Sequence, residues 1–249
     1  MHKKHIVFII LLILFILNSC SYLPLLDGMI PGGVSTYETS EYIEITPDSG
    51  LTSTTGFMFY PGGLVDPHAY IRPLGLFALN GYKVIIIKMP ANLAVLDGSK
   101  ALRFINSFSG VNKWIIGGHS LGGTFAANCI KSNPGIFQGL VLMGSYPADG
   151  DSLSGWGKPV LSLIGEFDGL ATPGEINQKT YLLPTSIPDA DPYPAPSGFT
   201  RYHTIVGGCH SYFGYYGMQD GDGSPTITVN DQHTEMATFL DNFFLAVSP

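Results

Sequence analysis

Short apolar runs are the clearest pattern along the chain, and most of them end at glycine, proline or a polar turn. Their spacing predicts strands at residues 41–46, 56–60, 83–87, 113–116, 139–143, 159–164 and 201–206. Apolar runs without strict alternation are typical of strands that are buried on both faces of a parallel sheet. We therefore expect a sheet whose two faces are both covered.

Segments with helical spacing separate these runs. We expect helices at residues 67–80, 97–108, 120–131 and 231–245, with Asp97 near the start of the second as a cap. Alternation of strands and helices predicts the α/β class, with a predominantly parallel sheet and helices on both faces. In such sheets ligands bind beyond the carboxyl ends of the strands.

The N-terminus has the pattern of a targeting signal. Two lysines precede an unbroken apolar run at residues 6–17, shorter than the about 20 residues that a membrane span needs. The letters LNSC at residues 17–20 then resemble a bacterial lipobox, in which the cysteine is acylated. We expect a lipoprotein signal peptide at residues 1–19 and a lipidated Cys20 that anchors the protein in the cell envelope, outside the cytoplasm. An ordinary cleaved signal and a short uncleaved anchor are the alternatives.

Composition limits the classes of partner. Residues 20–40 are rich in proline and glycine and are expected to form a tether, followed by one domain at residues 41–249. The formal net charge of −7 argues against a nucleic-acid partner. Besides Cys20 there are two cysteines, Cys129 and Cys209, expected as buried free thiols rather than a disulfide. No cysteine and histidine cluster suggests a metal, and no cofactor is expected.

The strongest chemical motif is GGHSLGG at residues 117–123, directly after an expected strand. The spacing Gly118-x-Ser120-x-Gly122 is the nucleophile-elbow pattern, a sharp turn between a strand and a helix. The strained turn leaves no room for side chains two residues to either side, which explains the glycines. Ser120 is therefore the candidate nucleophile, and the N–H of Leu121 would favour a developing oxyanion. A glycine-rich turn that binds a phosphate or nothing is the alternative.

Three segments together resemble the α/β-hydrolase fold family: GGHSLGG, FYPGGLVDPHAY at residues 59–70 and GEFDGLAT at residues 165–172. The resemblance covers residues 41–246. Within the family, the sequence most resembles small bacterial members related to dienelactone hydrolases and carboxylesterases. It implies a carboxylic-ester substrate, a Ser-His-Asp triad and an acyl-enzyme intermediate. The gap between the expected strands at 139–143 and 159–164 is too short for a lid domain, which predicts an open site.

The resemblance also assigns the other two triad members. Asp168 matches the family acid, with Glu166, Asp149 and Asp151 as rivals. His210 matches the family histidine, since it lies between the last expected strand and the closing helix. For His68, a surface or helix-capping role is favoured over a role in the pocket.

The loop after the strand at 56–60 is expected to supply the second oxyanion donor. Gly63 is the first candidate beside Leu121, and Leu64 is the next, whereas Pro61 has no N–H. Asp220 and Asp222 resemble a calcium loop only weakly, and a solvated turn is favoured. Aromatic side chains at residues 212–216 either line an apolar pocket or pack against the sheet.

A small ester or acyl compound is thus the expected substrate, and the lipid is the expected link to the membrane. An acyltransferase or peptidase with the same triad, and a non-catalytic hydrolase-fold binding protein, remain open at this point. The sequence does not indicate the oligomeric state.

Overall fold

The computed structural model describes residues 21–26, 29–189 and 198–247. Its strands form one sheet of nine in the order β1-β2-β4-β3-β5-β6-β7-β9-β8. They are β1 (Val34–Glu38), β2 (Tyr42–Pro47), β3 (Thr55–Tyr60), β4 (Val84–Ile87), β5 (Lys113–His119), β6 (Leu140–Met143), β7 (Val160–Gly165), β8 (Ser186–Ile187) and β9 (Thr200–Ile205). Within this sheet only β2 runs against the others. The predicted, mostly parallel α/β architecture is confirmed.

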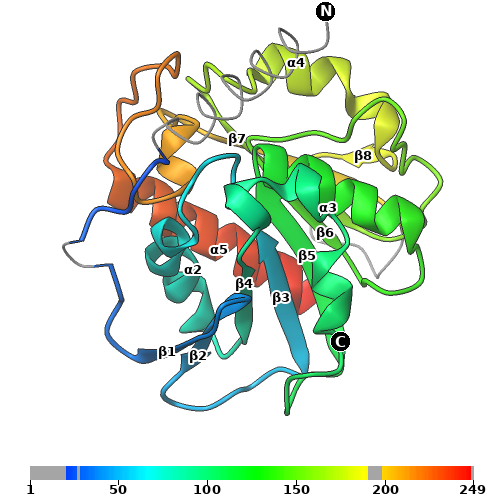
Figure 1. The fold of residues 1–249 in the computed structure, drawn as a ribbon. Helices are drawn as coiled ribbons and strands as arrows, with labels where there is room; N and C mark the ends of the chain where they lie inside the picture. Colours follow the sequence, from blue (N-terminus) through cyan, green and yellow to red (C-terminus); the bar gives the residue numbers. More distant parts are fainter. Residues whose placement is uncertain (1–20, 27–28, 190–197, 248–249) are drawn as a thin grey trace, which may run out of the picture.

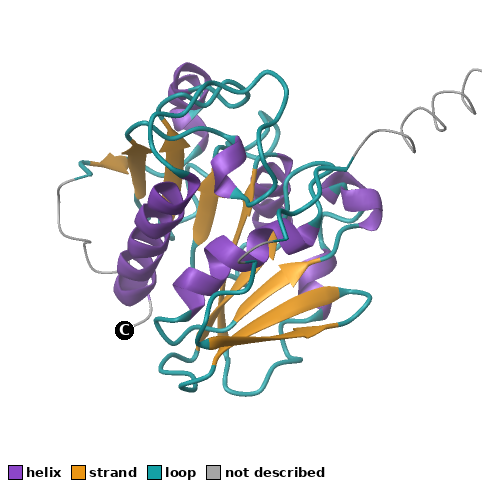
Figure 2. Ribbon diagram, turned by 90° about the vertical axis from the view of Figure 1, so that its left-hand side faces the viewer, coloured by secondary structure: helices purple, strands orange, loops and turns teal. Residues whose placement is uncertain are grey.

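Helices cover both faces of the sheet (Figures 1 and 2). The α-helices are α2 (Ile71–Ala78), α3 (Leu121–Ser132), α4 (Pro173–Gln178) and α5 (Val229–Val247). Short 3-10 helices are η1 (Pro67–Tyr70), η2 (Pro90–Asn92), η3 (Ala94–Leu96), η4 (Lys100–Arg103), η5 (Thr180–Leu182) and η6 (Ser211–Phe213). No separate lid domain is present among the described residues, in agreement with the short gap between β6 and β7.

Two hydrophobic cores lie on opposite sides of the sheet because successive strand residues point to opposite faces. In β3, Phe57 and Phe59 pack with α2 and α5, whereas Met58 and Tyr60 pack on the side of α3. The aromatic residues after β9 belong to the first core, since Phe213 and Tyr216 are buried in it. Packing in the core, rather than lining a pocket, is therefore the role of these two rings.

Two predicted elements differ from the structure. The expected helix at residues 97–108 is wrong, because only the short η4 forms there. The Tyr60 hydroxyl donates to the carbonyl of Gly98 and accepts from the N–H of Ala101, so a side chain takes two backbone groups that a helix would use. In addition, β1 lies inside the expected tether at residues 20–40, so the sheet begins earlier than residue 41.

Candidate active site

Ser120 stands in a strained turn between β5 and α3, with φ 52° and ψ −126°. A Cβ atom at Gly118 would lie 2.5 Å from the carbonyl carbon of Gly122, and one at Gly122 would lie 2.1 Å from the carbonyl oxygen of Tyr60. Only glycine fits at either position, as the elbow pattern predicts. The carbonyl of Ser120 accepts a 2.7 Å hydrogen bond from the hydroxyl of Ser145, which fixes the turn from the end of β6.

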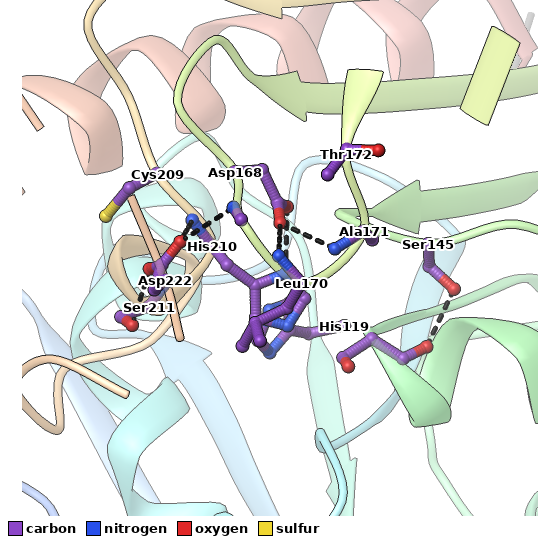
Figure 3. A network of polar contacts seen from close by, with 12 residues as sticks. His119, Ser145, Asp168, Leu170, Ala171, Thr172, Cys209, His210, Ser211 and Asp222 are labelled. Carbon is purple, nitrogen blue, oxygen red and sulfur yellow. Dashed lines mark hydrogen bonds and ion pairs between the residues drawn. The ribbon is translucent and has the colours of Figure 1, made fainter. Parts of the chain in front are cut away.

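Asp168 and His210 form a buried pair next to this turn (Figure 3). Asp168 follows β7, His210 follows β9, and 2.8 Å separates His210 Nδ1 from Asp168 Oδ2. The other carboxylate oxygen of Asp168 accepts from the N–H groups of Leu170 and Ala171, at 2.9 and 2.7 Å. Because the carboxylate is the acceptor, the proton of a neutral His210 lies on Nδ1, and Nε2 keeps its lone pair.

His210 Nε2 is buried and has no hydrogen-bond partner within the described part of the chain. His210 lies near the elbow, because its ring centroid is 4.3 Å from that of His119 and a Cβ at Gly144, which lines the same cleft as Ser120, would lie 2.9 Å from His210 Nδ1. Catalytic hydrogen bonds are often long in the absence of substrate and shorten when it binds. A cleft of about 220 Å³ opens at Ser120; its lining residues are Ser120, Leu121, Thr124, Gly144, Ser145, Tyr146, Leu170 and Ala171.

The loop after β3 leaves one N–H for an oxyanion. Gly62 donates to the hydroxyl of Tyr70 at 2.9 Å, and Leu64 donates to the carbonyl of Asn92 at 2.9 Å. The N–H of Gly63 has no partner among the residues that the structure describes. A Cβ at Gly63 would lie 3.1 Å from the side chain of Leu121, so the two residues are neighbours. The N–H of Leu64, the alternative donor, is thus already hydrogen-bonded, which favours Gly63 as the donor.

His119, beside Ser120, is buried and packs against His210. Its Nδ1 lies 2.8 Å from the hydroxyl of Tyr70, and its ring centroid lies 4.3 Å from that of His210. Burial, and then the neighbouring His210 imidazole, hold the pKa of His119 well below its usual range. His119 therefore packs against His210 as a neutral imidazole near neutral pH.

The rival acids and histidines lie elsewhere. Glu166 accepts from the N–H of Gly207, Asp149 pairs with Lys179 and Asp151 accepts from Asn128. His68 lies inside η1 and bonds Asp66 and Glu38; its partial exposure agrees with the surface role favoured above, whereas the residue that caps η1 is Asp66, which accepts from the N–H of His68. His203 lies between Asp189 and Glu235, and His233 lies 3.2 Å from the carbonyl oxygen of Gly214. Asp168 is therefore the carboxylate that meets His210.

Asp222 is the residue whose importance the sequence did not show. One oxygen accepts from the N–H groups of Gly169, His210 and Gly223 at 3.1, 3.2 and 2.8 Å. The other accepts from the N–H and hydroxyl of Ser211, both at 2.7 Å. The carboxylate thus ties the histidine loop to the acid loop (Figure 3). The expectation of a solvated turn is wrong for this residue, and its place in an Asp-Gly repeat after the histidine was the available signal.

Burial raises the pKa of Asp222, but the hydrogen bonds from Ser211, Gly169 and His210 outweigh it and lower the pKa overall. Asp222 is therefore held as a carboxylate. No cluster of three metal-ligating side chains occurs in residues 21–26, 29–189 and 198–247. Cys129 and Cys209 are free and buried, and burial raises their pKa to about 11 and about 12. Neither thiol is a nucleophile at neutral pH.

A family model, described as the alpha/beta hydrolase family, matches residues 56–234. The chain belongs to the alpha/beta hydrolase family. No curated protein matches it significantly in sequence. Its fold is similar to a dienelactone hydrolase from Anabaena variabilis, with a TM-score of 0.61 and 13% identity over 87% of this chain and 100% of the other. It is also similar to an esterase from Mycobacterium tuberculosis, with a TM-score of 0.55 and 11% identity over 85% and 90%. At these identities the likeness shows the hydrolase fold.

Proposed function

We propose that this hydrolase cleaves carboxylic esters through an acyl-enzyme on Ser120, with His210 as the general base and Asp168 as its orienting partner. One observation carries the proposal: Nδ1 of a buried His210 is 2.8 Å from Asp168, while its Nε2 has no partner among the described residues. A histidine held in this tautomer offers a basic nitrogen to a neighbouring hydroxyl. That hydroxyl belongs to a serine in an elbow turn.

The reaction then follows from the positions of these groups. The Oγ of Ser120 attacks the ester carbonyl and passes its proton to His210 Nε2, while Asp168 stabilises the imidazolium. The N–H groups of Gly63 and Leu121 donate to the oxyanion. Collapse of the tetrahedral intermediate releases the alcohol, which takes the proton from His210. Water, deprotonated by His210, then attacks the acyl-enzyme and releases the acid and Ser120.

Acyl transfer and peptide hydrolysis use the same acyl-enzyme, so they differ from this proposal in the leaving group or the second nucleophile. The cleft contains no charged residue that would bind a peptide terminus. A protein that only binds would need neither the unpartnered Nε2 nor a strained serine, because such strain persists only where the surroundings enforce it.

Replacement of Ser120 by alanine tests the proposal. A panel of p-nitrophenyl esters of increasing chain length, together with labelling by a fluorophosphonate, measures activity and nucleophile reactivity. We expect Ser120→Ala to lose roughly 10⁴–10⁶-fold in kcat and all labelling. The exposed Ser154→Ala serves as the matched control and should resemble the wild type. More than a tenth of wild-type activity in Ser120→Ala would remove this serine from the mechanism.

We further propose that the protein is held at a membrane by a lipid on Cys20. This residue and the signal segment lie outside the described residues, and no described helix has the length and apolar character of a membrane span. The support is the lipobox-like pattern that follows the apolar run. Palmitate should label the wild type and not Cys20→Ser, which should also leave the membrane fraction. Equal membrane retention of the variant would favour an uncleaved anchor.

A further inference from the structure

The chain immediately after Cys20 is bound to the loop that carries the proposed oxyanion donor. The N–H of Tyr22 donates to the carbonyl of Leu64 at 2.8 Å, and the N–H of Asp66 donates to the carbonyl of Tyr22 at 2.9 Å. These two bonds flank a parallel bridge between Tyr22 and Val65. Residues 21–26 therefore do not behave as the free tether that their composition suggests.

The same segment reaches the loop that follows His210. The N–H of Leu25 donates to the carbonyl of Tyr215 at 2.9 Å, and the Tyr22 ring lies 5.6 Å from the ring of Tyr216. In Figure 1 the dark blue segment lies beside the orange loop after β9. Residues 21–26, which we name the N-terminal strap, thus connect the two loops that flank the site.

The strap exposes apolar side chains to solvent. Leu23 is 65% exposed and Leu26 is 81% exposed, and the strap carries no charged residue. Further exposed apolar side chains lie at the same end of the sheet, namely Phe167 after β7, Val206 after β9, and Val95 and Leu96 after η2. The η2 residue Asn92 belongs to this end because its carbonyl accepts the N–H of Leu64. Leu23 and Leu26 lie within one six-residue segment, so the strap itself presents a small apolar surface, and grouped exposed apolar side chains mark a contact surface.

The short stretch of chain between the strap and Cys20 indicates that a membrane covers this apolar surface. Cys20 is two residues before Tyr22, so at most about 7 Å of extended chain separates the attachment point of a lipid on Cys20 from Tyr22, since an extended residue spans at most about 3.5 Å. A free, flexible tether of 20 residues would instead have a root-mean-square length of roughly 25 Å. A strap fixed to the domain therefore brings the bilayer to the mouth of the site.

We propose that the strap docks the carboxyl-end face of the sheet on the lipid surface, and that the substrates are neutral esters that reside in the bilayer. This inference rests on the proposed ester hydrolysis and on the lipid at Cys20. The occupant of the apolar surface is the acyl region of the membrane. The side chains of Leu23 and Leu26 enter it beside the lipid of Cys20.

Two substrates separate membrane docking from catalysis. The full chain is reconstituted in phosphatidylcholine vesicles, and its hydrolysis of vesicle-borne 4-methylumbelliferyl oleate is compared with that of water-soluble p-nitrophenyl acetate. We expect Leu23→Ser with Leu26→Ser to lower hydrolysis of the oleate about tenfold and to leave the acetate unchanged, because two leucine side chains leave the lipid. The matched control is Leu245→Ser, at the far end of α5 and 63% exposed, which should change neither rate. Equal effects on both substrates, or none, would overturn the inference.

A depth measurement gives a result that does not depend on activity. Leu26→Cys and Leu245→Cys are each labelled with a nitrobenzoxadiazole probe, which the buried Cys129 and Cys209 do not take up. Doxyl-labelled lipids should quench the probe at residue 26 and not at residue 245. Quenching at residue 26 without hydrolysis of either ester would leave docking intact and refute the proposed function. Acetate hydrolysis without quenching at residue 26 would support the proposed function and refute membrane docking.

Discussion

Substitution of Gly144 tests the pair of Asp168 and His210 directly, because a single methyl group at this position would clash with both side chains. A Cβ there would lie 2.7 Å from Asp168 Oδ2 and 2.9 Å from His210 Nδ1. Ordinary contact begins at 3.4 Å, so the carboxylate would have to move by about 0.7 Å and the imidazole by about 0.5 Å. A misplacement of about 1 Å can cost on the order of 100-fold in rate. We therefore expect Gly144→Ala to lower kcat by roughly 10- to 100-fold.

The same substitution also has a backbone cost, which needs a separate control. Gly144 has φ +49°, and a non-glycine residue in the left-handed region loses about 1–2 kcal/mol. Gly50 has φ +89° and no atom within 4 Å of a Cβ position, and it lies between β2 and β3, at the other end of β3 from the site. Gly50→Ala should therefore lose similar stability and keep its kcat.

Hydrolysis of a short p-nitrophenyl ester gives kcat for both variants, and urea unfolding gives their stability. If Gly144→Ala keeps full activity while folded, the pair at 2.8 Å does not carry the reaction. If Gly50→Ala loses as much kcat as Gly144→Ala, the effect arises from backbone strain and not from displacement of the pair.

The remaining predictions concern Asp222. Asp222→Asn keeps one acceptor oxygen and places an amide donor against the N–H groups, so we expect kcat to fall by roughly tenfold or more with little change in KM. The control Asp220→Asn, at an exposed position, should match the wild type in kcat and KM. Because hydrogen bonds lower the pKa of Asp222 in the folded state, its stabilisation is present above the unfolded value of about 3.9 and is lost as the pH falls through the folded pKa. The difference in urea stability between wild type and Asp222→Asn should therefore shrink toward zero below about pH 3.9. A constant difference down to pH 2.5 would contradict this account.

The sequence predicted those features that depend on local pattern. Seven strands were placed because buried parallel strands are continuous apolar runs. The elbow was placed because its glycines stand two residues to either side of Ser120, where a side chain would clash with backbone. Family order then selected Asp168 and His210, which the structure brings to 2.8 Å. Their catalytic roles stay predictions.

The features that sequence missed depend on contacts between distant segments. The expected helix at 97–108 does not form because Tyr60, 38 residues before Gly98, captures its backbone groups. Asp222 organises the site through Gly169, 53 residues away; the Asp-Gly repeat marks the position of Asp222 but not this partner. The docking of Tyr22 on Leu64 likewise joins a proline-containing segment to a loop after β3. Composition suggested flexibility there, while long-range backbone pairing decided the structure.

The chemistry of the cleft and the proposed docking of the domain on a membrane favour the same kind of substrate. None of the eight side chains around the 220 Å³ cleft is charged, so a substrate with a carboxylate or ammonium group near the scissile bond would lose its hydration without gaining a partner. Leu121, Tyr146 and Leu170 instead offer apolar contact to an acyl or alcohol group. A neutral, apolar ester is scarce in water and concentrated in a bilayer. An enzyme that selects such a compound gains rate if its open cleft faces the phase that holds the substrate, which is the geometry that the N-terminal strap would impose.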